Sequence, residues 1–119
     1  MNLQFTQTDV AMAQSFADKA KLWQSGPVTI ASVEGDNDTL QVGAFAITQV
    51  EDTRVTKSIL GERIEPAIAF VVTAGLQRYC RDTGDEVDIV DIAREWTLRK
   101  ALQACAHAEL DWALDSMEY

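Results

Sequence analysis

The chain has 119 residues, of which 19 are acidic and 10 are basic, so its net charge at pH 7 is −9. A charge of this sign repels DNA, RNA and anionic membranes and favours basic partners. The hydrophobic fraction of 47% excludes intrinsic disorder, and no apolar run reaches the roughly 20 residues that a membrane-spanning helix needs.

The N-terminal stretch "MNLQFTQTDVAMAQSFADKA" lacks a basic segment followed by an apolar run, which is the pattern of a secretory signal. We therefore expect a cytoplasmic protein that folds as one domain over residues 1–119. Cys80 and Cys105 are too few for a disulfide framework, so both are expected to be reduced.

An amphipathic helix is predicted from Thr6 or Thr8 to about Gln24. Its apolar residues recur at three- and four-residue spacing and define one stripe that we expect to be buried: Met12, Phe16, Ala20 and Trp23, with Ala13 and Ala17 beside them. The sequence "SGP" at residues 25–27 then ends the helix.

A β-hairpin is predicted next, because two runs with strand-like alternation flank the turn-forming cluster "EGDND" at residues 34–38. We expect its strands at residues 28–34 and 40–50. Residues 53–60 form a further short β-type run, so the predicted sheet has either two or three antiparallel strands.

Two helices are predicted to follow the sheet. The run "AIAFVVTAGLQRYC" after Pro66 is apolar on nearly every side, which is typical of a helix buried in the core, and Pro66 suits its first turn. Gly84 is expected to end this helix, and Asp88 to cap a final helix from about Ile89 to Met117. The expected fold is therefore α+β: an amphipathic N-terminal helix, a hairpin or three-stranded antiparallel sheet, and two C-terminal helices, one buried and one long.

Five carboxylates lie within ten positions of the stretch "RDTGDEVDIVDIAREW", residues 81–96. A calcium-binding loop started at Asp82 has Val87 where glycine is required, and one started at Asp36 has Leu40 and Ile47 where oxygen ligands are required. We explain these acids by their position at the start of the final helix, where the helix dipole favours negative charge.

No metal, cofactor or catalytic site is expected. Cys105 and His107 lie two residues apart on a helix, so their side chains diverge by about 200° and cannot build a zinc site alone. His107 is the single histidine, no serine lies in a nucleophile-elbow motif, and the glycines form neither a phosphate loop nor a dinucleotide fingerprint. An enzyme is therefore not expected, although the sequence leaves open a pair of carboxylates that perform acid–base chemistry.

A second acidic cluster lies near the C-terminus, where the helix dipole disfavours anions. Either its carboxylates are simply solvated, or they face a basic partner. Trp112 and Tyr119 lie among them, and aromatic residues ringed by charges are frequent anchors of protein interfaces. The candidate partner-binding residues are Asp111, Trp112, Asp115, Glu118 and Tyr119.

The leading functional hypothesis is a small acidic protein-binding module that docks on a basic protein surface, such as that of a nucleic-acid-binding protein. The class analogy is with inhibitors, antidotes and nucleic-acid mimics from phages and mobile elements. One alternative is a structural or chaperone-like homodimer that buries the excess apolar surface of the two C-terminal helices. Another is an enzyme or small-ligand-binding domain with a carboxylate-based site.

Overall fold

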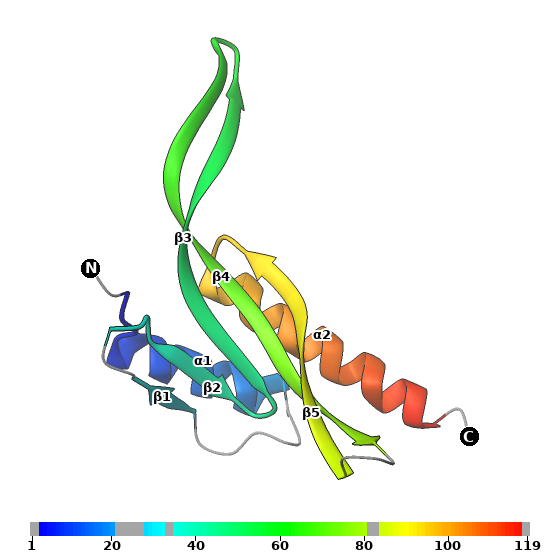
Figure 1. The fold of residues 1–119 in the computed structure, drawn as a ribbon. Helices are drawn as coiled ribbons and strands as arrows, with labels where there is room; N and C mark the ends of the chain where they lie inside the picture. Colours follow the sequence, from blue (N-terminus) through cyan, green and yellow to red (C-terminus); the bar gives the residue numbers. More distant parts are fainter. Residues whose placement is uncertain (1–2, 21–27, 33–34, 81–83, 118–119) are drawn as a thin grey trace.

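The chain folds into a helix layer over one face of an antiparallel sheet, as a computed structural model shows for residues 3–20, 28–32, 35–80 and 84–117 (Figure 1). For residues 20, 76–80, 84–88 and 112–117 the backbone alone is described. In chain order the elements are α1 (Gln7–Ala20), β1 (Thr29–Ala31), β2 (Thr39–Val42), β3 (Phe45–Ser58), β4 (Gly61–Cys80), β5 (Gly84–Glu95) and α2 (Leu98–Met117).

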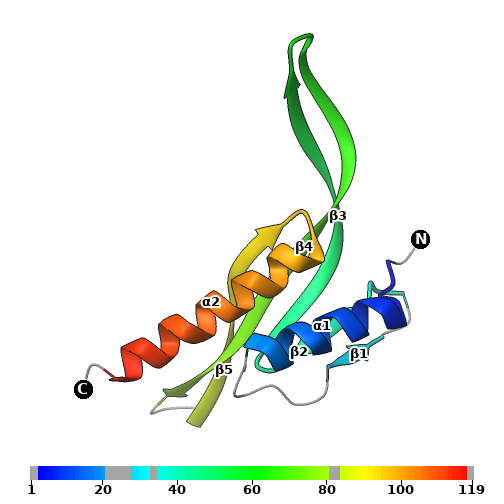
Figure 2. The ribbon, with the colours of Figure 1, turned by 180° about the vertical axis from the view of Figure 1, so that it is seen from behind.

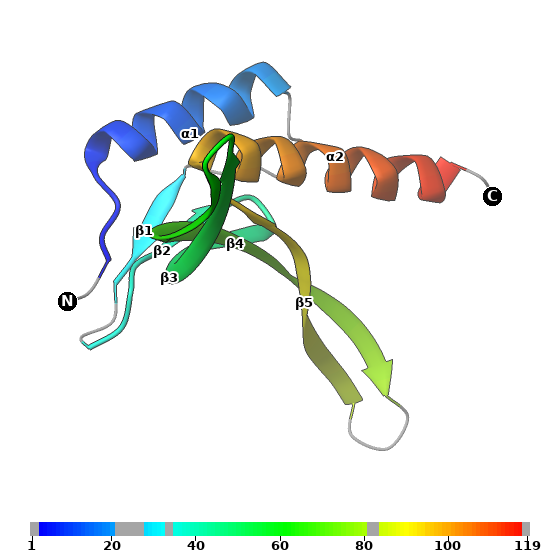
Figure 3. The same cartoon turned by 90° about the horizontal axis from the view of Figure 1, so that it is seen from above.

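The five strands of the described residues form a meander in the order β1-β2-β3-β4-β5, in which each strand is antiparallel to the next. Two connections are two-residue turns, at residues 43–44 and 59–60. Gly43 and Gly61 have positive φ angles of 61° and 115° at these turns, a conformation that glycine adopts without a Cβ clash. Viewed from above, α1 and α2 lie on the same side of the sheet (Figure 3).

The core lies between the two helices and the sheet. Its largest fully buried side chains come from β2, β3, β4 and α2: Leu40, Val42, Phe45, Ile47, Val72, Leu102 and Cys105. α1 contributes the small side chains of Ala13 and Ala17. Burial of each large apolar side chain stabilises the fold by about 1.5–3 kcal/mol, so this cluster is the main source of stability.

α1 begins at the predicted position. The Thr6 hydroxyl accepts a hydrogen bond from the backbone N–H of Asp9 (3.2 Å), and the Asp9 carboxylate accepts one from the N–H of Thr6 (2.8 Å). This reciprocal arrangement is a capping box, which satisfies two N–H groups that the helix itself leaves without acceptors. The predicted end of the helix at Gln24, with Trp23, lies outside the described residues.

The buried face of α1 is offset from the predicted stripe. Ala13 and Ala17 are buried, whereas Met12 is 41% exposed and Phe16 is only half-buried. The prediction that Met12 is buried is therefore wrong. Spacing along a helix shows that one side is apolar, but it does not show which part of that side a neighbouring element covers.

The predicted turn cluster ties the N-terminal segment to the sheet. Asp38 is buried, and its carboxylate accepts hydrogen bonds from the backbone N–H of Phe5 (3.1 Å) and the hydroxyl of Ser32 (2.8 Å). The side-chain oxygen of Asn37 accepts another from the N–H of Leu3 (2.9 Å). The Asn37 and Asp38 side chains therefore have a structural role in this turn.

The predicted two- or three-stranded sheet is wrong in strand number, although β1 and β2 do pair across the turn cluster. The strand expected at residues 40–50 is divided by the turn at Gly43 into β2 and the start of β3. Residues 53–58 continue β3 instead of forming a separate strand. β4 and β5, both expected to be helical, complete the sheet.

The predicted buried helix after Pro66 is wrong, because residues 61–80 form strand β4. An apolar run is compatible with a buried helix or a buried strand, and periodicity alone does not separate the two. In the fold Phe70, Val72 and Ala74 alternate toward the helix-covered core. Pro66 is opposite Thr53, where β4 has no strand on its outer side, so the missing N–H costs no hydrogen bond there.

The predicted long helix from Ile89 is also wrong in its first part, because residues 84–95 form strand β5. β5 pairs with the end of β4 along its whole length, so Gly84 ends no helix and Asp88 caps none. The carboxylates of this stretch are therefore strand residues, and the helix dipole does not explain them. Acids near a helix start are favourable, but pairing with a long neighbouring strand decides the conformation here.

α2 begins only at Leu98. The Thr97 hydroxyl accepts a hydrogen bond from the backbone N–H of Lys100 (3.2 Å) and so caps the first turn. With 20 residues, α2 is about 30 Å long at 1.5 Å per residue. The helix is therefore shorter than the one predicted from Ile89 to Met117.

Candidate protein-binding site

A two-stranded arm is the most distinctive surface feature of the fold. β3 pairs with β2 only as far as Thr48, and β4 pairs with β5 only from Phe70 onward, whereas β3 and β4 pair with each other out to Ser58 and Gly61. The ribbon consequently projects beyond the rest of the sheet (Figure 1). We define residues 53–66 as the arm.

The tip of the arm is apolar. Ile59 and Leu60 form the two-residue turn and are 104% and 98% exposed. The Ser58 hydroxyl organises the turn, since it accepts a hydrogen bond from the N–H of Leu60 (3.2 Å) and donates one to the carbonyl of Gly61 (3.3 Å). Two-residue turns usually contain Asn, Asp or Gly, so the turn itself gives no reason for two large apolar side chains.

One face of the arm carries an exposed apolar pair. Val55 and Ile64 are cross-strand partners with exposed fractions of 52% and 69%. By alternation they share the face of Phe70 and Val72, which the helices cover over the body of the sheet. Lys57 and Glu62 lie on the same face of the arm, so Val55 and Ile64 are an apolar pair beside an ion pair, where neither α1 nor α2 covers them (Figures 1 and 2).

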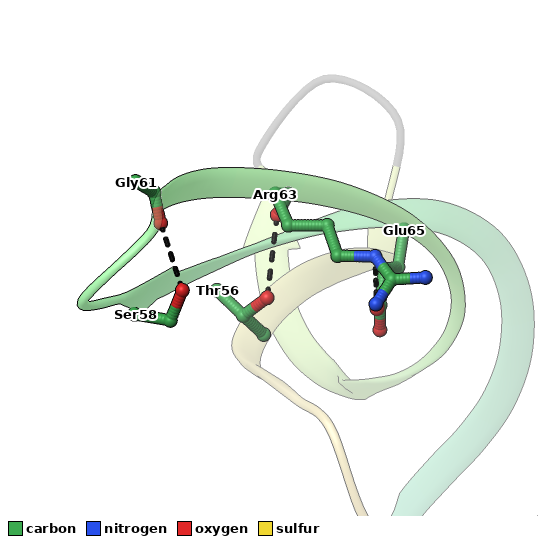
Figure 4. Close-up of polar contacts among 5 residues, drawn as sticks. All are labelled: Thr56, Ser58, Gly61, Arg63 and Glu65. Atoms are coloured by element: carbon green, nitrogen blue, oxygen red, sulfur yellow. Dashed lines mark hydrogen bonds and ion pairs between the residues drawn. The ribbon is translucent and has the colours of Figure 1, made fainter.

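The opposite face of the arm is polar (Figure 4). The Thr56 hydroxyl donates a hydrogen bond to the carbonyl of Arg63 (3.4 Å), and the Arg63 guanidinium lies 2.9 Å from the Glu65 carboxylate. These side chains are largely exposed, and exposed ion pairs stabilise a fold by about 0–1 kcal/mol. The two faces of the arm therefore differ, since one is polar throughout and the other carries Val55 and Ile64.

Contacts at the base set the direction of the arm. Arg94, near the end of β5, forms an ion pair with Asp52 of β3. The guanidinium of Arg54 lies over the ring of Trp96, 5.8 Å from its centroid, which is within the range of a cation–π interaction. The first contact joins β3 to β5 and the second joins β3 to the segment between β5 and α2, so both hold the base of the arm against the body of the fold.

Three of the predicted partner-binding residues, Asp111, Trp112 and Asp115, lie on α2 and not on the arm. Asp111 is exposed on α2 and, with Glu95, Lys100 and His107, lines a polar groove of about 540 Å³ between α2 and β5. For Trp112 and Asp115 only the helical backbone is described, and Glu118 and Tyr119 lie outside the described residues. Whether the five residues form one surface therefore stays a prediction. In Figure 1 the C-terminal end of α2 points away from the arm.

Sequence reasoning missed Ile59 and Leu60, which were assigned to the end of a short strand. The available signal was the sequence "TRVTKSILGERIEP", in which two apolar residues directly precede a glycine between two polar, alternating runs. Two β-type runs separated by a few residues that include a glycine are typical of a hairpin. The extension of the hairpin beyond the sheet depends on where β2 and β5 stop, which is a tertiary property.

Two observations on the described residues concern metal binding and nucleophilic catalysis. Among them, no three His, Cys, Asp or Glu side chains lie close enough together to hold a metal ion. Burial raises the pKa of the Cys105 thiol to about 12, and Glu109 adds to the shift, so this thiol is protonated at neutral pH and is a poor nucleophile.

Comparison with protein-family models, with curated proteins and with solved structures finds no match for the chain. Within the described residues, neither helix combines the length and the apolarity that crossing a membrane requires. The arm and the surfaces around it are therefore the candidate functional site.

Proposed function

We propose that this protein is a protein-binding module that engages its partner through the arm. The observation that carries the proposal is the complete exposure of Ile59 and Leu60 at the most distant point of the ribbon. Burial of two such side chains in a partner would contribute about 3–6 kcal/mol, at 1.5–3 kcal/mol for each. A few well-buried side chains near the centre of an interface commonly supply most of its affinity.

The isolation of the arm supports the same proposal. A two-stranded ribbon without a covered face is only marginally stable in water. Val55 and Ile64 add apolar surface next to the tip, which distinguishes this region from the single exposed apolar residues that are normal on protein surfaces. A partner that covers Val55 and Ile64 would extend to the arm the packing that α1 and α2 provide over the rest of the sheet.

The fold affects one of the hypotheses drawn from the sequence and leaves another as it was. A homodimer built on two C-terminal helices is not supported, because residues 61–80 form a strand and α2 alone follows the sheet in the described residues. Docking of the acidic C-terminal residues on a basic partner, in the manner of an inhibitor, antidote or nucleic-acid mimic, remains a separate prediction that the arm neither requires nor opposes.

Site-specific photo-crosslinking in cells of the native host tests the proposal. A photoreactive amino acid replaces Ile59, and the matched control carries it at Asp36, an exposed position in the β1–β2 connection. We expect a defined protein adduct from position 59 and none from position 36. Absence of any adduct from position 59 would overturn the proposal.

A further inference from the structure

The arm has two outer edges, and its hydrogen-bond pattern defines which backbone groups lie along them. Ser58 and Gly61 flank a two-residue turn and form a hydrogen-bonded pair, from which hydrogen-bonded and non-hydrogen-bonded pairs alternate along the ribbon. The odd-numbered residues of β3 therefore direct their N–H and C=O groups away from β4. In agreement, the Gln49 carbonyl accepts a hydrogen bond from the side chain of Asn37 (2.9 Å), which precedes β2.

The outer edge of β4 is blocked by proline. Its outward groups belong to even-numbered residues, and one of these is Pro66, which has no N–H to offer to an added strand. The other outer edges of the described sheet are protected in different ways. β1 has only three residues, while β5 has a bulge opposite Val72 and Thr73 and carries five carboxylates. Short strands, bulges, charges and proline are the usual means by which sheets avoid unwanted pairing.

The outer edge of β3 has neither proline nor bulge over residues 51–57. Its pairing with β4 is continuous there, and β2 ends opposite Thr48. The N–H of Thr53 is bonded to the side chain of its neighbour Asp52 (2.7 Å), as expected for a group that points away from β4. A regular strand edge of this kind is a template for another strand.

Pairing of this edge with itself brings the exposed apolar residues together. If Val55 lies opposite Val55 of a second, antiparallel copy, a two-fold axis perpendicular to the sheet relates the copies and keeps equivalent faces on the same side. Ile64 lies opposite Val55 within each arm. One row across the joint ribbon then consists of Ile64, Val55, Val55 and Ile64, and cross-strand apolar pairs of this kind stabilise a sheet.

The same register matches opposite charges. Lys57 lies opposite Thr53 of the second copy and diagonal to its Glu51, a separation that long side chains bridge. Within its own arm Lys57 is 3.9 Å from Glu62, and both side chains are exposed. Each Lys57 therefore lies between two carboxylates, one from each copy.

The alternative register next to this one is unfavourable. If Val55 lay opposite Thr53, the two Arg54 side chains would oppose each other directly, which is destabilising. The tip would also reach Gln49, whose carbonyl is already bonded within its own copy. With Val55 opposite itself, Arg54 lies opposite Thr56, and the tip ends opposite residue 51.

The antiparallel arrangement also keeps the acidic bodies apart. Residues 54–65 carry three basic and two acidic residues, whereas the remainder of the chain carries seven basic and seventeen acidic residues. Glu51 of each copy lies opposite Ile59 of the other, so the two arm bases are about eight residues or roughly 27 Å apart along the ribbon. This separation is several times the Debye length of about 8 Å at physiological ionic strength, so repulsion between the bodies is weak.

We infer that two copies of the chain pair their arms through the β3 edges, as an antiparallel two-fold dimer with Val55 opposite Val55. This inference rests on the proposed function, because it names a second copy as the partner of the arm. Pairing converts two exposed two-stranded ribbons into one four-stranded sheet, and at least three strands are needed for a sheet to be stable by itself. The contact is isologous, so the dimer is closed and does not grow.

Proline substitutions on the two edges test the inference. Val55→Pro removes an N–H that points outward, so it blocks the β3 edge and keeps the hydrogen bonds between β3 and β4. Glu62→Pro is the matched control, because its N–H also points outward but lies on the edge that Pro66 already blocks. Circular dichroism and thermal melting establish that each variant is folded, and sedimentation velocity measures the dissociation constant of the dimer.

We expect the wild type and Glu62→Pro to dimerise with similar dissociation constants. Val55→Pro should associate at least about tenfold more weakly, because each dimer loses two backbone hydrogen bonds. A wild type that stays monomeric into the high micromolar range, or a Val55→Pro variant that dimerises as well as the wild type, would overturn the inference.

Disulfide trapping in a Cys80→Ser background tests the register. Val55→Cys places two thiols across the two-fold axis, where opposite Cα atoms are about 5.5 Å apart, within the range that a disulfide requires. Ile64→Cys is the control on the same face, because the two copies of residue 64 lie three strand spacings or about 14 Å apart. Val55→Cys should form linked dimers at least about tenfold faster, since only its thiols meet. Equal rates would refute the register.

The crosslink from position 59 separates failure of this inference from failure of the proposed function. An adduct with β3 of another copy supports both. An adduct with a different protein, together with a monomeric wild type, overturns the inference and leaves the proposed function standing. A monomeric wild type that gives no adduct with any protein overturns both.

Discussion

Replacement of Asp38 by alanine is expected to destabilise the protein strongly, although this residue lies in an acidic turn that suggests a ligand site. Its buried carboxylate accepts hydrogen bonds from the N–H of Phe5 and the hydroxyl of Ser32, at 3.1 Å and 2.8 Å. Hydrogen bonds to a charged group contribute about 1.5–3 kcal/mol each. The substitution removes both of them.

The magnitude is less than the sum of two such bonds. Ser32 is exposed, so its hydroxyl regains a water partner, whereas Phe5 is buried and its N–H loses its acceptor. We therefore expect Asp38→Ala to lower the free energy of unfolding by about 2–4 kcal/mol, mainly through the Phe5 amide. For a chain of this length, the melting temperature would fall by roughly 10 °C.

Urea denaturation followed by circular dichroism measures this loss. The matched control is Asp36→Ala in the same turn, which is exposed and should stay within about 0.5 kcal/mol of the wild type. Asp38→Asn keeps an acceptor oxygen and should lie between the two. If Asp38→Ala is as stable as Asp36→Ala, these hydrogen bonds do not hold the N-terminal segment, and the structural role that we assign to the turn is refuted.

Three further predictions follow from the same structure. In one variant, Asn-Gly replaces residues 57–62 and forms a two-residue turn between the cross-strand partners Thr56 and Arg63. Its melting temperature should lie within a few degrees of that of the wild type, because the removed tip contributes nothing to the core, and a large drop would contradict this. In a Cys80→Ser background, iodoacetamide should not modify native Cys105 up to about pH 9, since its raised pKa keeps the thiol protonated, and should modify it after unfolding, as mass spectrometry would show. Charge reversal of the acidic C-terminal residues Asp111, Asp115 and Glu118 to Lys should abolish binding to a basic partner without unfolding the protein, and unchanged binding in a pull-down would remove that surface from consideration.

Features that depend on neighbouring residues in the chain were predictable. The start of α1 follows from the Thr6 and Asp9 side chains, which bond to each other's backbone within a single turn. The pairing of β1 with β2 likewise follows from a cluster of turn formers between two short β-type runs. In both cases the interactions that decide the structure span few residues.

The candidate site was not predictable in this way. The sequence "SIL" before Gly61 indicates a turn, but the exposure of Ile59 and Leu60 depends on β2 and β5 ending well short of it. The exposure of Met12 likewise depends on how α2 packs beside α1. The acidic charge near the C-terminus instead favoured a site at Asp111 and the residues after it.

By itself, the sequence determined the helix start at Thr6 and the presence of a turn at residues 34–38, because a hydrogen bond within one turn and local backbone preferences govern these features. Only the tertiary structure decided that the apolar run after Pro66 is a strand and that the acids after Gly84 belong to its neighbour in the sheet. An apolar run must be buried, but whether it is buried as helix or strand depends on the partners available across the fold. The arm arises from that same choice, since β4 pairs with β3 beyond the rest of the sheet.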